Sequence, residues 1–157
     1  MRLDQRWIAA HIPHQGRMCL LEEVLSWDEQ QLLCRAGSHR AIDHPLRAHG
    51  RLGSACAIEY AAQAAAVHGA LLQPRAPARA DAAAAASMLA SARAVELAVR
   101  RLDDIRGDLL ISAVRLQHDA RGALYAFALQ EQPGEAAGAG RQLAHGRLSL
   151  WLATSIL

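Results

Sequence analysis

The sequence contains no lysine and only six aromatic residues among its 157 residues. All seventeen basic residues are arginine, which indicates a codon bias rather than a binding function, and interspersed acidic residues leave a net charge of +2. A nucleic-acid-binding protein would show a basic stripe and aromatic side chains for base stacking. We therefore expect no nucleic-acid partner, whereas scattered arginines are compatible with an acidic carrier protein.

Cysteine is also scarce. Cys19, Cys34 and Cys56 are odd in number, far apart and in no Cys-x-x-Cys pair, so the sequence predicts neither a disulfide framework nor a thiolate metal site. The first ten residues carry three charges, beginning with Arg2, where a secretory signal would have its apolar core. Both observations favour a reduced, cytoplasmic location.

Nucleotide-binding and nucleophile motifs are absent as well. The chain has no Gly-x-Ser-x-Gly elbow, no P-loop and no dinucleotide glycine fingerprint. Its histidines could suggest a metal site, but no cysteine or carboxylate lies at ligand spacing beside His11-x-x-His14 or beside His39, His44 and His49. We expect neither a cofactor nor a metal ion.

One long apolar segment dominates what is present. Residues 55–72 carry only four polar side chains, and Pro74 follows, so the pattern predicts a buried helix with Ser54 as its N-terminal cap. A membrane span is the competing interpretation. Because a carboxylate at the centre of a span would cost about 2.5–3.5 kcal/mol, and Glu59 lies there, we expect no span.

Short apolar runs bounded by turn residues predict about six strands around that helix. A short helix over residues 4–10 precedes a hairpin and an irregular loop, residues 74–82 read as a linker, and the alanine-rich residues 82–92 have a local preference for helix. The predicted hairpin covers residues 18–27 and 30–37, the loop 38–53, and the later strands 95–102, 108–118, 123–130 and 143–153. A single α+β domain over residues 1–157 follows, with an antiparallel sheet wrapped around the helix.

Glu59 is the first candidate for chemistry. A carboxylate inside an apolar helix is unfavourable unless it is paired, neutralised or used, because burial disfavours its charged form. Gln63 lies one turn further on and shares the same face, where its amide could bind the carboxylate or a ligand. Pairing of Glu59 with a buried arginine is the structural alternative.

His44 is the second candidate, on the loop fifteen residues before Glu59. An ordinary histidine pKa of about 6.5 suits a general base near neutrality. With eight histidines in the chain, most must be surface or packing residues. The start of the helix at Gly53 and Ser54 would offer free backbone amides to an oxyanion that develops on a thioester carbonyl.

Three segments of the chain are residues 12–24 (IPHQGRMCLLEEV), residues 58–64 (IEYAAQA) and Gly107-Asp108. Together they resemble the β-hydroxyacyl-acyl-carrier-protein dehydratases, which have the hotdog fold. Residues 12–24 resemble the family's Pro-His-Arg-x-Pro-x-x-Leu-x-Asp-Arg-Val opening. Residues 58–64 (IEYAAQA) resemble the Leu-Glu-Ala-Leu-Ala-Gln-Ala of its central helix, and Gly107-Asp108 resembles the Pro-Gly-Asp of a late strand. The loop departs from the family, because His44-Pro45-Leu46-Arg47 replaces His-Phe-Pro-Gly. Residues 50–69 look closer to a divergent subgroup that occurs with aryl-polyene and related pigment biosynthesis.

The resemblance implies a hotdog domain that dimerises and removes water from a 3-hydroxyacyl chain on an acyl carrier protein, giving the trans-2-enoyl thioester. By resemblance, His44 would take the α proton, Glu59 from the other subunit would help the β-hydroxyl leave, and the backbone at Gly53 and Ser54 would stabilise the oxyanion. Gln63 is expected to bind substrate. The resemblance also makes the alanine-rich segment a strand.

Two alternatives remain open. A non-catalytic dehydratase-like subunit, which binds acyl chains or supports an active hotdog partner, predicts that His44 points away from Glu59. A hotdog thioesterase would instead hydrolyse the thioester with a carboxylate-activated water. In each case we expect a homodimer or a heterodimer with another hotdog dehydratase, because a sheet wrapped around one helix leaves an edge strand that a second sheet can complete.

Overall fold

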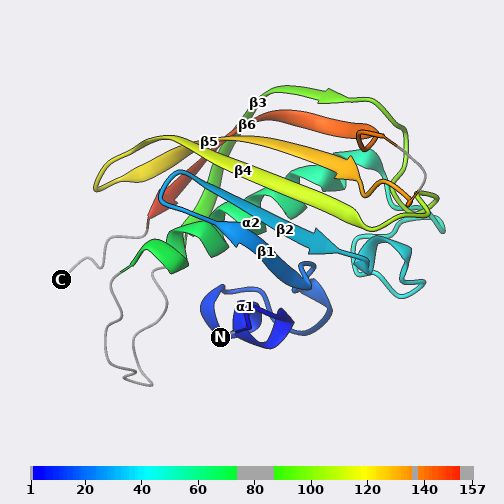
Figure 1. The fold of residues 1–157 in the computed structure, drawn as a ribbon, viewed down its shortest axis with the longest axis horizontal. Helices are drawn as coiled ribbons and strands as arrows, with labels where there is room; N and C mark the ends of the chain where they lie inside the picture. Colours follow the sequence, from blue (N-terminus) through cyan, green and yellow to red (C-terminus); the bar gives the residue numbers. More distant parts are fainter. Residues whose placement is uncertain (1, 74–86, 136–137, 153–157) are drawn as a thin grey trace.

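The computed structural model describes residues 2–73, 87–135 and 138–152. These residues form one six-stranded antiparallel sheet with the strand order β1-β2-β4-β5-β6-β3. The sheet curves over the helix α2, and the short helix α1 lies beside β1 (Figure 1). This is the predicted arrangement of a single sheet around one long helix, the hotdog architecture.

The first half of the sheet is the predicted hairpin. β1 (Glu23–Trp27) pairs antiparallel with β2 (Gln31–Ala36). Oδ1 of Asp28 accepts hydrogen bonds from the backbone amides of Gln30 and Gln31, at 2.8 and 2.9 Å, and so closes the turn. The predicted first strand was too long, because residues Gly16–Met18 form a 3₁₀ turn and β1 begins only at Glu23.

α2 (Ala57–Leu72) is the predicted buried helix. Nine of its residues are buried, mostly alanines, and it packs against β4 with further contacts to β2, β5 and β6. The small alanine side chains let the helix approach the sheet closely, which is why an apolar face this poor in large residues can fill the core. The prediction of Ser54 as the cap is wrong: Ser54 opens a 3₁₀ turn (Ser54–Cys56), and no side chain caps α2 at its N-cap residue, Cys56.

The observed bounds of β3 (Ser87–Leu97) differ from the predicted bounds, 95–102. The strand was expected to begin at Val95, and local propensity favoured helix before it. Pairing of residues from Ser87 onward with β6 (Gln142–Leu152) overrides the helical preference of the alanines, as the resemblance implied. Ala94 has φ 50° at an irregularity between Arg93 and Glu96, where the pairing with β6 is interrupted before it resumes. The strand ends at Leu97, five residues before the predicted end at Leu102. The linker 74–82 and residues 82–86 lie outside the described residues.

The remaining strands follow the prediction closely. β4 (Leu109–His118) and β5 (Gly122–Glu131) pair with each other, and β5 pairs with β6. At the β4–β5 turn, Oδ1 of Asp119 accepts hydrogen bonds from the amides of Arg121 and Gly122. α1 (Gln5–His11) also matches its prediction, with Asp4 as the N-cap that accepts a bond from the Trp7 amide. No described helix has the length and apolar character of a membrane span.

The two sheet edges differ. The amide of Val24 in β1 donates to the carbonyl of Leu3, and Asp4 forms a bridge with Glu23, so the chain that leads into α1 covers part of this edge. β3 forms the other edge, and its apolar side chains Met88, Leu89 and Leu97 are exposed.

Candidate active site

The carboxylate of Glu59 is held from two sides. Oε1 lies 2.9 Å from Nε2 of Gln63 and 2.9 Å from Nε2 of His14, while Oε2 has no hydrogen-bond partner among the described residues. About a quarter of the side chain is exposed. The hydrogen bond from His14 lowers the pKa of Glu59, burial opposes it, and the bond from Gln63 lowers it further. The carboxylate is therefore ionised at neutral pH in the single chain.

Gln63 is fully buried, and its side-chain oxygen and both amide hydrogens are engaged in hydrogen bonds. Its amide nitrogen donates to Glu59 and, at 2.7 Å, to the carbonyl of Met18, and its oxygen accepts from the amide of Leu20 at 2.9 Å. These bonds join the Pro-His segment to α2 and fix the amide orientation. Because both hydrogens of the amide are engaged, Gln63 orients the carboxylate in this structure and offers no free donor to a ligand.

His44 belongs to a different network. Its Nε2 lies 3.1 Å from the hydroxyl of Tyr60. The Tyr60 hydroxyl lies 2.7 Å from Oγ of Ser38, and the Ser38 hydroxyl donates to the carbonyl of Leu20 at 2.8 Å. Nδ1 of His44 accepts from the amide of Leu46 at 3.1 Å. Since Ser38 uses its only proton on Leu20, Tyr60 donates to Ser38 and accepts from His44.

This network fixes the tautomer of His44. With Nδ1 accepting from a backbone amide, the single proton of the neutral imidazole lies on Nε2, so neither nitrogen has a free lone pair. Burial lowers the pKa of His44, and the nearby Arg47 lowers it further. His44 is neutral in this site but is not poised to accept a proton without first changing partners.

The structure of the single chain therefore does not bring the two predicted residues, His44 and Glu59, together. Glu59 and Tyr60 are neighbours in α2, so their side chains leave the helix about 100° apart, Glu59 toward His14 and Tyr60 toward His44. Pairing of Glu59 with a buried arginine is not what the structure shows. Sequence reasoning missed His14 and Tyr60 as site residues, although His14 lies in the Pro-His motif and Tyr60 is a polar residue on an otherwise apolar helix.

Gly53 and Ser54 dock the loop on the segment after β3. The Ser54 amide donates to the carbonyl of Arg100 at 3.1 Å, and the Leu102 amide donates to the carbonyl of Leu52 at 2.8 Å, on either side of a bridge between Gly53 and Arg101. The Ser54 amide is thus unavailable to an oxyanion in this structure. The amide of Gly53 makes no hydrogen bond to the described residues and remains the candidate donor.

No alternative site competes with the one around Glu59 among the described residues. Among residues 2–73, 87–135 and 138–152, no group of three histidine, cysteine or acidic side chains could hold a metal ion. A cavity of about 480 Å³ lies at the β4–β5 turn against Ser149, Leu150 and Trp151, and none of the candidate residues lines it.

Comparison with known structures establishes the fold. The dehydratase heterocomplex ApeI:P from Xenorhabdus doucetiae matches with a TM-score of 0.72 and 22% identity over 94% of this chain and 91% of that one. A thioesterase family protein from Silicibacter pomeroyi matches with a TM-score of 0.61 and 13% identity, over 94% and 93% of the two chains. Zebra fish thioesterase superfamily member 2 matches with a TM-score of 0.60 and 17% identity, over 95% of each chain.

Sequence comparison establishes the family. A search of the curated proteins found no match. The family model described as ApeP-like, ApeP dehydratase, matches residues 6–154, which is nearly the whole chain. The match confirms the dehydratase resemblance predicted from the Pro-His segment and the helix, and the chain belongs to the ApeP-like dehydratase family.

Proposed function

We propose that this protein removes water from a 3-hydroxyacyl thioester on an acyl carrier protein, at a site centred on Glu59, to give the trans-2-enoyl thioester in a fatty-acid-like or polyene pathway. The observation that carries the proposal is the half-buried carboxylate, fixed through Oε1 by His14 and Gln63 and free at Oε2. The family match supports the reaction class.

Elimination needs a base at the α carbon and a proton for the departing hydroxyl. Glu59 is ionised in the isolated protomer, so its role as the acid requires that bound substrate and a second subunit exclude water and raise its pKa. His44 of the facing subunit is the proposed base. It must release Nδ1 from the Leu46 amide before it accepts a proton, because Nε2 already carries the proton that is donated to Tyr60. The amide of Gly53 would then stabilise the thioester oxyanion.

A second candidate function follows from the same tautomer. If His44 keeps both of its hydrogen bonds, the chain is a dehydratase-like subunit that supports an active hotdog partner. The ApeI:P neighbour is itself a dehydratase heterocomplex, which supports this arrangement by analogy. The thioesterase alternative has support only from fold neighbours, and the product separates it from dehydration.

The deciding experiment measures conversion of a 3-hydroxyacyl carrier-protein thioester by the mass loss of one water. Wild type, His44→Ala and Glu59→Gln are compared, with the exposed loop histidine variant His49→Ala as the matched control. We expect activity in wild type and His49→Ala and its loss in the other two. Activity that persists in His44→Ala would remove His44 as the base, and activity only after adding a partner dehydratase would favour the non-catalytic subunit. Release of free hydroxy acid would identify a thioesterase.

The exposed edge β3 is the proposed interface with a second hotdog subunit. An uncovered strand edge with exposed apolar side chains is a ready surface for a further strand, and Met88 is 66% exposed. Met88→Asp should shift the protein from dimer to monomer in light scattering, whereas Leu116→Asp, an exposed leucine on the internal strand β4, should not. An unchanged mass for Met88→Asp would exclude this edge.

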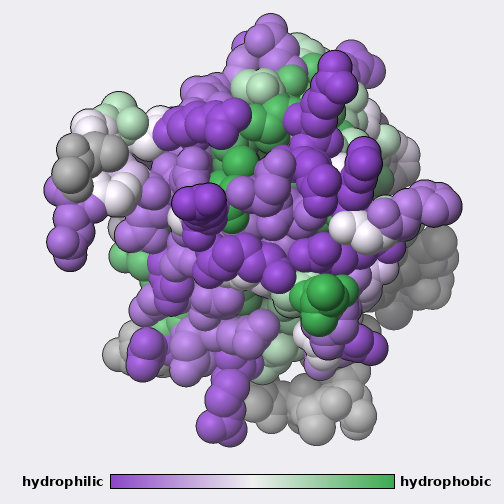
Figure 2. Space-filling model, turned by 90° about the vertical axis from the view of Figure 1, so that its right-hand side faces the viewer, coloured by the Kyte–Doolittle hydropathy of each residue, from purple (hydrophilic) through white to green (hydrophobic). Residues whose placement is uncertain are grey.

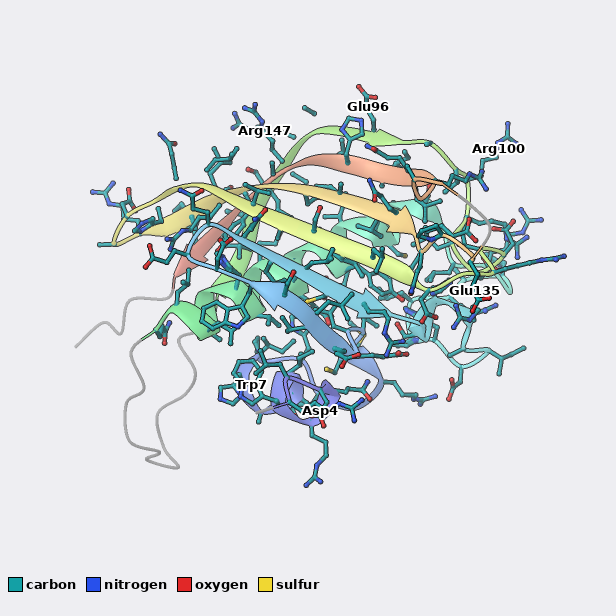
Figure 3. All side chains as sticks on the ribbon, in the orientation of Figure 1. Asp4, Trp7, Glu96, Arg100, Glu135 and Arg147 are labelled. Atoms are coloured by element: carbon teal, nitrogen blue, oxygen red, sulfur yellow. The ribbon has the colours of Figure 1, made fainter. Side chains whose placement is uncertain are left out.

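Three exposed arginines support the acyl carrier protein as the partner that delivers substrate. Arg47 and Arg101 pair with Asp103, but Arg51, Arg100 and Arg106 make no ion pair with the described residues. Arg100 points outward at one end of the molecule (Figure 3), and that end is mainly hydrophilic (Figure 2). The Arg100 carbonyl bonds the Ser54 amide, so this surface adjoins the start of α2.

The carrier-protein proposal can be tested with the same assay. Arg51→Glu combined with Arg100→Glu should raise KM for the carrier-protein thioester while KM for a short pantetheine thioester stays unchanged. Arg121→Glu, at the β4–β5 turn, is the control. Equal effects on both substrates would contradict carrier binding at this surface.

The three free cysteines support the proposed reduced, cytoplasmic compartment.

A further inference from the structure

His14 reaches Glu59 from a rigid piece of backbone. Ile12 is buried, and the side-chain amide of Gln15 donates to the carbonyl of Ala9 at 2.6 Å, which ties the segment to the end of α1. Gly16 then turns the chain with φ 59°. The position of His14 is therefore set by its neighbours, and its contact with Glu59 does not depend on a flexible surface loop.

The hydrogen-bond geometry assigns each atom of the cluster a role. The carboxylate can only accept, so Nε2 of His14 carries a proton and donates it to Oε1 at 2.9 Å, beside the donor from Gln63. Nδ1 of His14 is buried and has no partner among the described residues. Two donors thus occupy one oxygen of Glu59 and leave the other oxygen open.

We propose that His14 is a positioning residue of the dehydration reaction: together with Gln63 it holds Oε1 of Glu59 so that Oε2 faces the substrate. The inference rests on the proposed function, because it takes Glu59 as the working carboxylate. It assigns to the Pro-His segment a role at the reacting group that the sequence did not reveal, and it makes His14, rather than His44, the histidine coupled to Glu59 within a protomer.

The titratable groups that face the Glu59 carboxylate are His14 and the thiol of Cys56, the N-cap residue of α2 three positions before Glu59. His14 is the largest cause that lowers the pKa of Glu59, and burial acts in the opposite direction. Removing His14 should therefore raise the pKa of Glu59, because the burial effect then has less to oppose it.

Two substitutions of His14 separate positioning from simple packing. A glutamine amide nitrogen can take the place of Nε2, whereas an asparagine amide lies near the place of Nδ1 and does not reach Glu59. His14→Gln should therefore behave like wild type and His14→Asn should not. His11→Gln is the matched control, since His11 is an exposed histidine that bonds Trp7 and not Glu59.

The experiment follows the side-chain carboxyl of Glu59 by ¹³C NMR as the pH is varied, with the signal assigned by its loss in Glu59→Gln. In His14→Asn the titration midpoint should rise and kcat for dehydration should fall about 10- to 100-fold with a smaller change in KM, the size expected for a lost charge-assisted hydrogen bond. His14→Gln should restore both values, and His11→Gln should change neither.

The outcomes distinguish this inference from the proposed function. An unchanged Glu59 midpoint in a folded His14→Asn, or a shift as large in His14→Gln as in His14→Asn, would overturn the positioning role. A midpoint that moves as expected while no variant, wild type included, dehydrates any substrate would support the coupling of His14 to Glu59 and refute dehydration by this chain.

Discussion

Nε2 of His44 lies 3.1 Å from the hydroxyl of Tyr60, the residue that follows Glu59 in α2. Two consecutive helix residues thus each hold a histidine from a different loop, one with a carboxylate and one with a phenol. Burial raises the pKa of the Tyr60 hydroxyl well above its usual range, so the phenol remains protonated and can serve only as a neutral hydrogen-bond partner. The pair with His44 is a neutral link that fixes the loop on the helix.

Tyr60→Phe should test that link. The substitution leaves the Nε2 proton of His44 without an acceptor and leaves Ser38 without its donor, and a buried polar group without a partner costs about 1–3 kcal/mol. We expect a decrease of that size in the free energy of unfolding, measured with urea. The ¹³C titration of Glu59 should be unchanged because Tyr60 does not contact it, and a Glu59 shift would show that the two networks are coupled.

The extent to which the sequence predicts this site can be argued from the same residues. A long, almost wholly apolar segment that ends before Pro74 located α2, and the carboxylate inside it marked Glu59 without any structure. The partner of Glu59 could not be predicted, because His14 lies 45 positions earlier and meets α2 only through tertiary packing that Gln63 establishes with Met18 and Leu20. Resemblance pointed to the loop histidine, but the hydrogen-bond directions at His44 depend on Leu46 and Tyr60, which no motif encodes.

The strands also divide into those that local sequence signals predict and one that such signals do not. Turn residues such as Arg121 and Gly122 are local signals, and they located β4 and β5 within a residue or two. β3 was predicted eight residues short at its start because alanines carry a helical preference, and only the pairing with β6 reverses it. Local patterns therefore predict elements that are closed by their own turns and fail for an edge strand that depends on a distant partner.

Buried histidines predict loss of stability in mild acid. His39, His44 and His68 each have a pKa lowered chiefly by burial. Below their ordinary pKa of about 6.5 the unfolded chain takes up protons that the folded chain does not, so the free energy of unfolding falls as the pH drops from 7 through the lowered folded-state values. Urea unfolding at pH 7.5 and 5.5 should show this decrease.

His68 allows the effect to be assigned to one residue. Its Nε2 donates to the carbonyl of Asp28 and its Nδ1 accepts from the hydroxyl of Tyr125, both at 2.9 Å, so a second proton has no acceptor in the present arrangement. His68→Gln should be less stable at pH 7.5 but should lose less between the two pH values. The exposed variant His118→Gln should lose as much as wild type, and an equal loss in His68→Gln would contradict the assignment.

Asp103 should hold the loop that carries His44 against the segment after β3. It pairs with Arg101 and accepts from the amide of Leu52 at 2.9 Å, and these bonds lower its pKa. In Asp103→Ala we expect amide hydrogen exchange at Leu52 and Leu102 to become about tenfold faster or more, because both amides belong to this docked region. Asp104→Ala, an exposed neighbour, is the control. Unchanged protection at Leu102, whose amide donates to the Leu52 carbonyl and not to Asp103, would show that backbone pairing alone docks the loop.

Gly122 and Gly69 should respond to alanine in opposite directions. A Cβ at Gly122 would lie 2.1 Å from the carbonyl oxygen of Leu150, a backbone atom that cannot move without breaking the β5–β6 pairing, so Gly122→Ala should lower the free energy of unfolding by about 1–3 kcal/mol. A Cβ at Gly69 meets nothing within 4 Å, and alanine is favoured over glycine inside a helix by about 1 kcal/mol. Gly69→Ala should therefore raise the stability by up to that amount. Urea unfolding of both variants decides the matter, and equal losses would mean that packing around α2 is tighter than the open space beside Gly69 indicates.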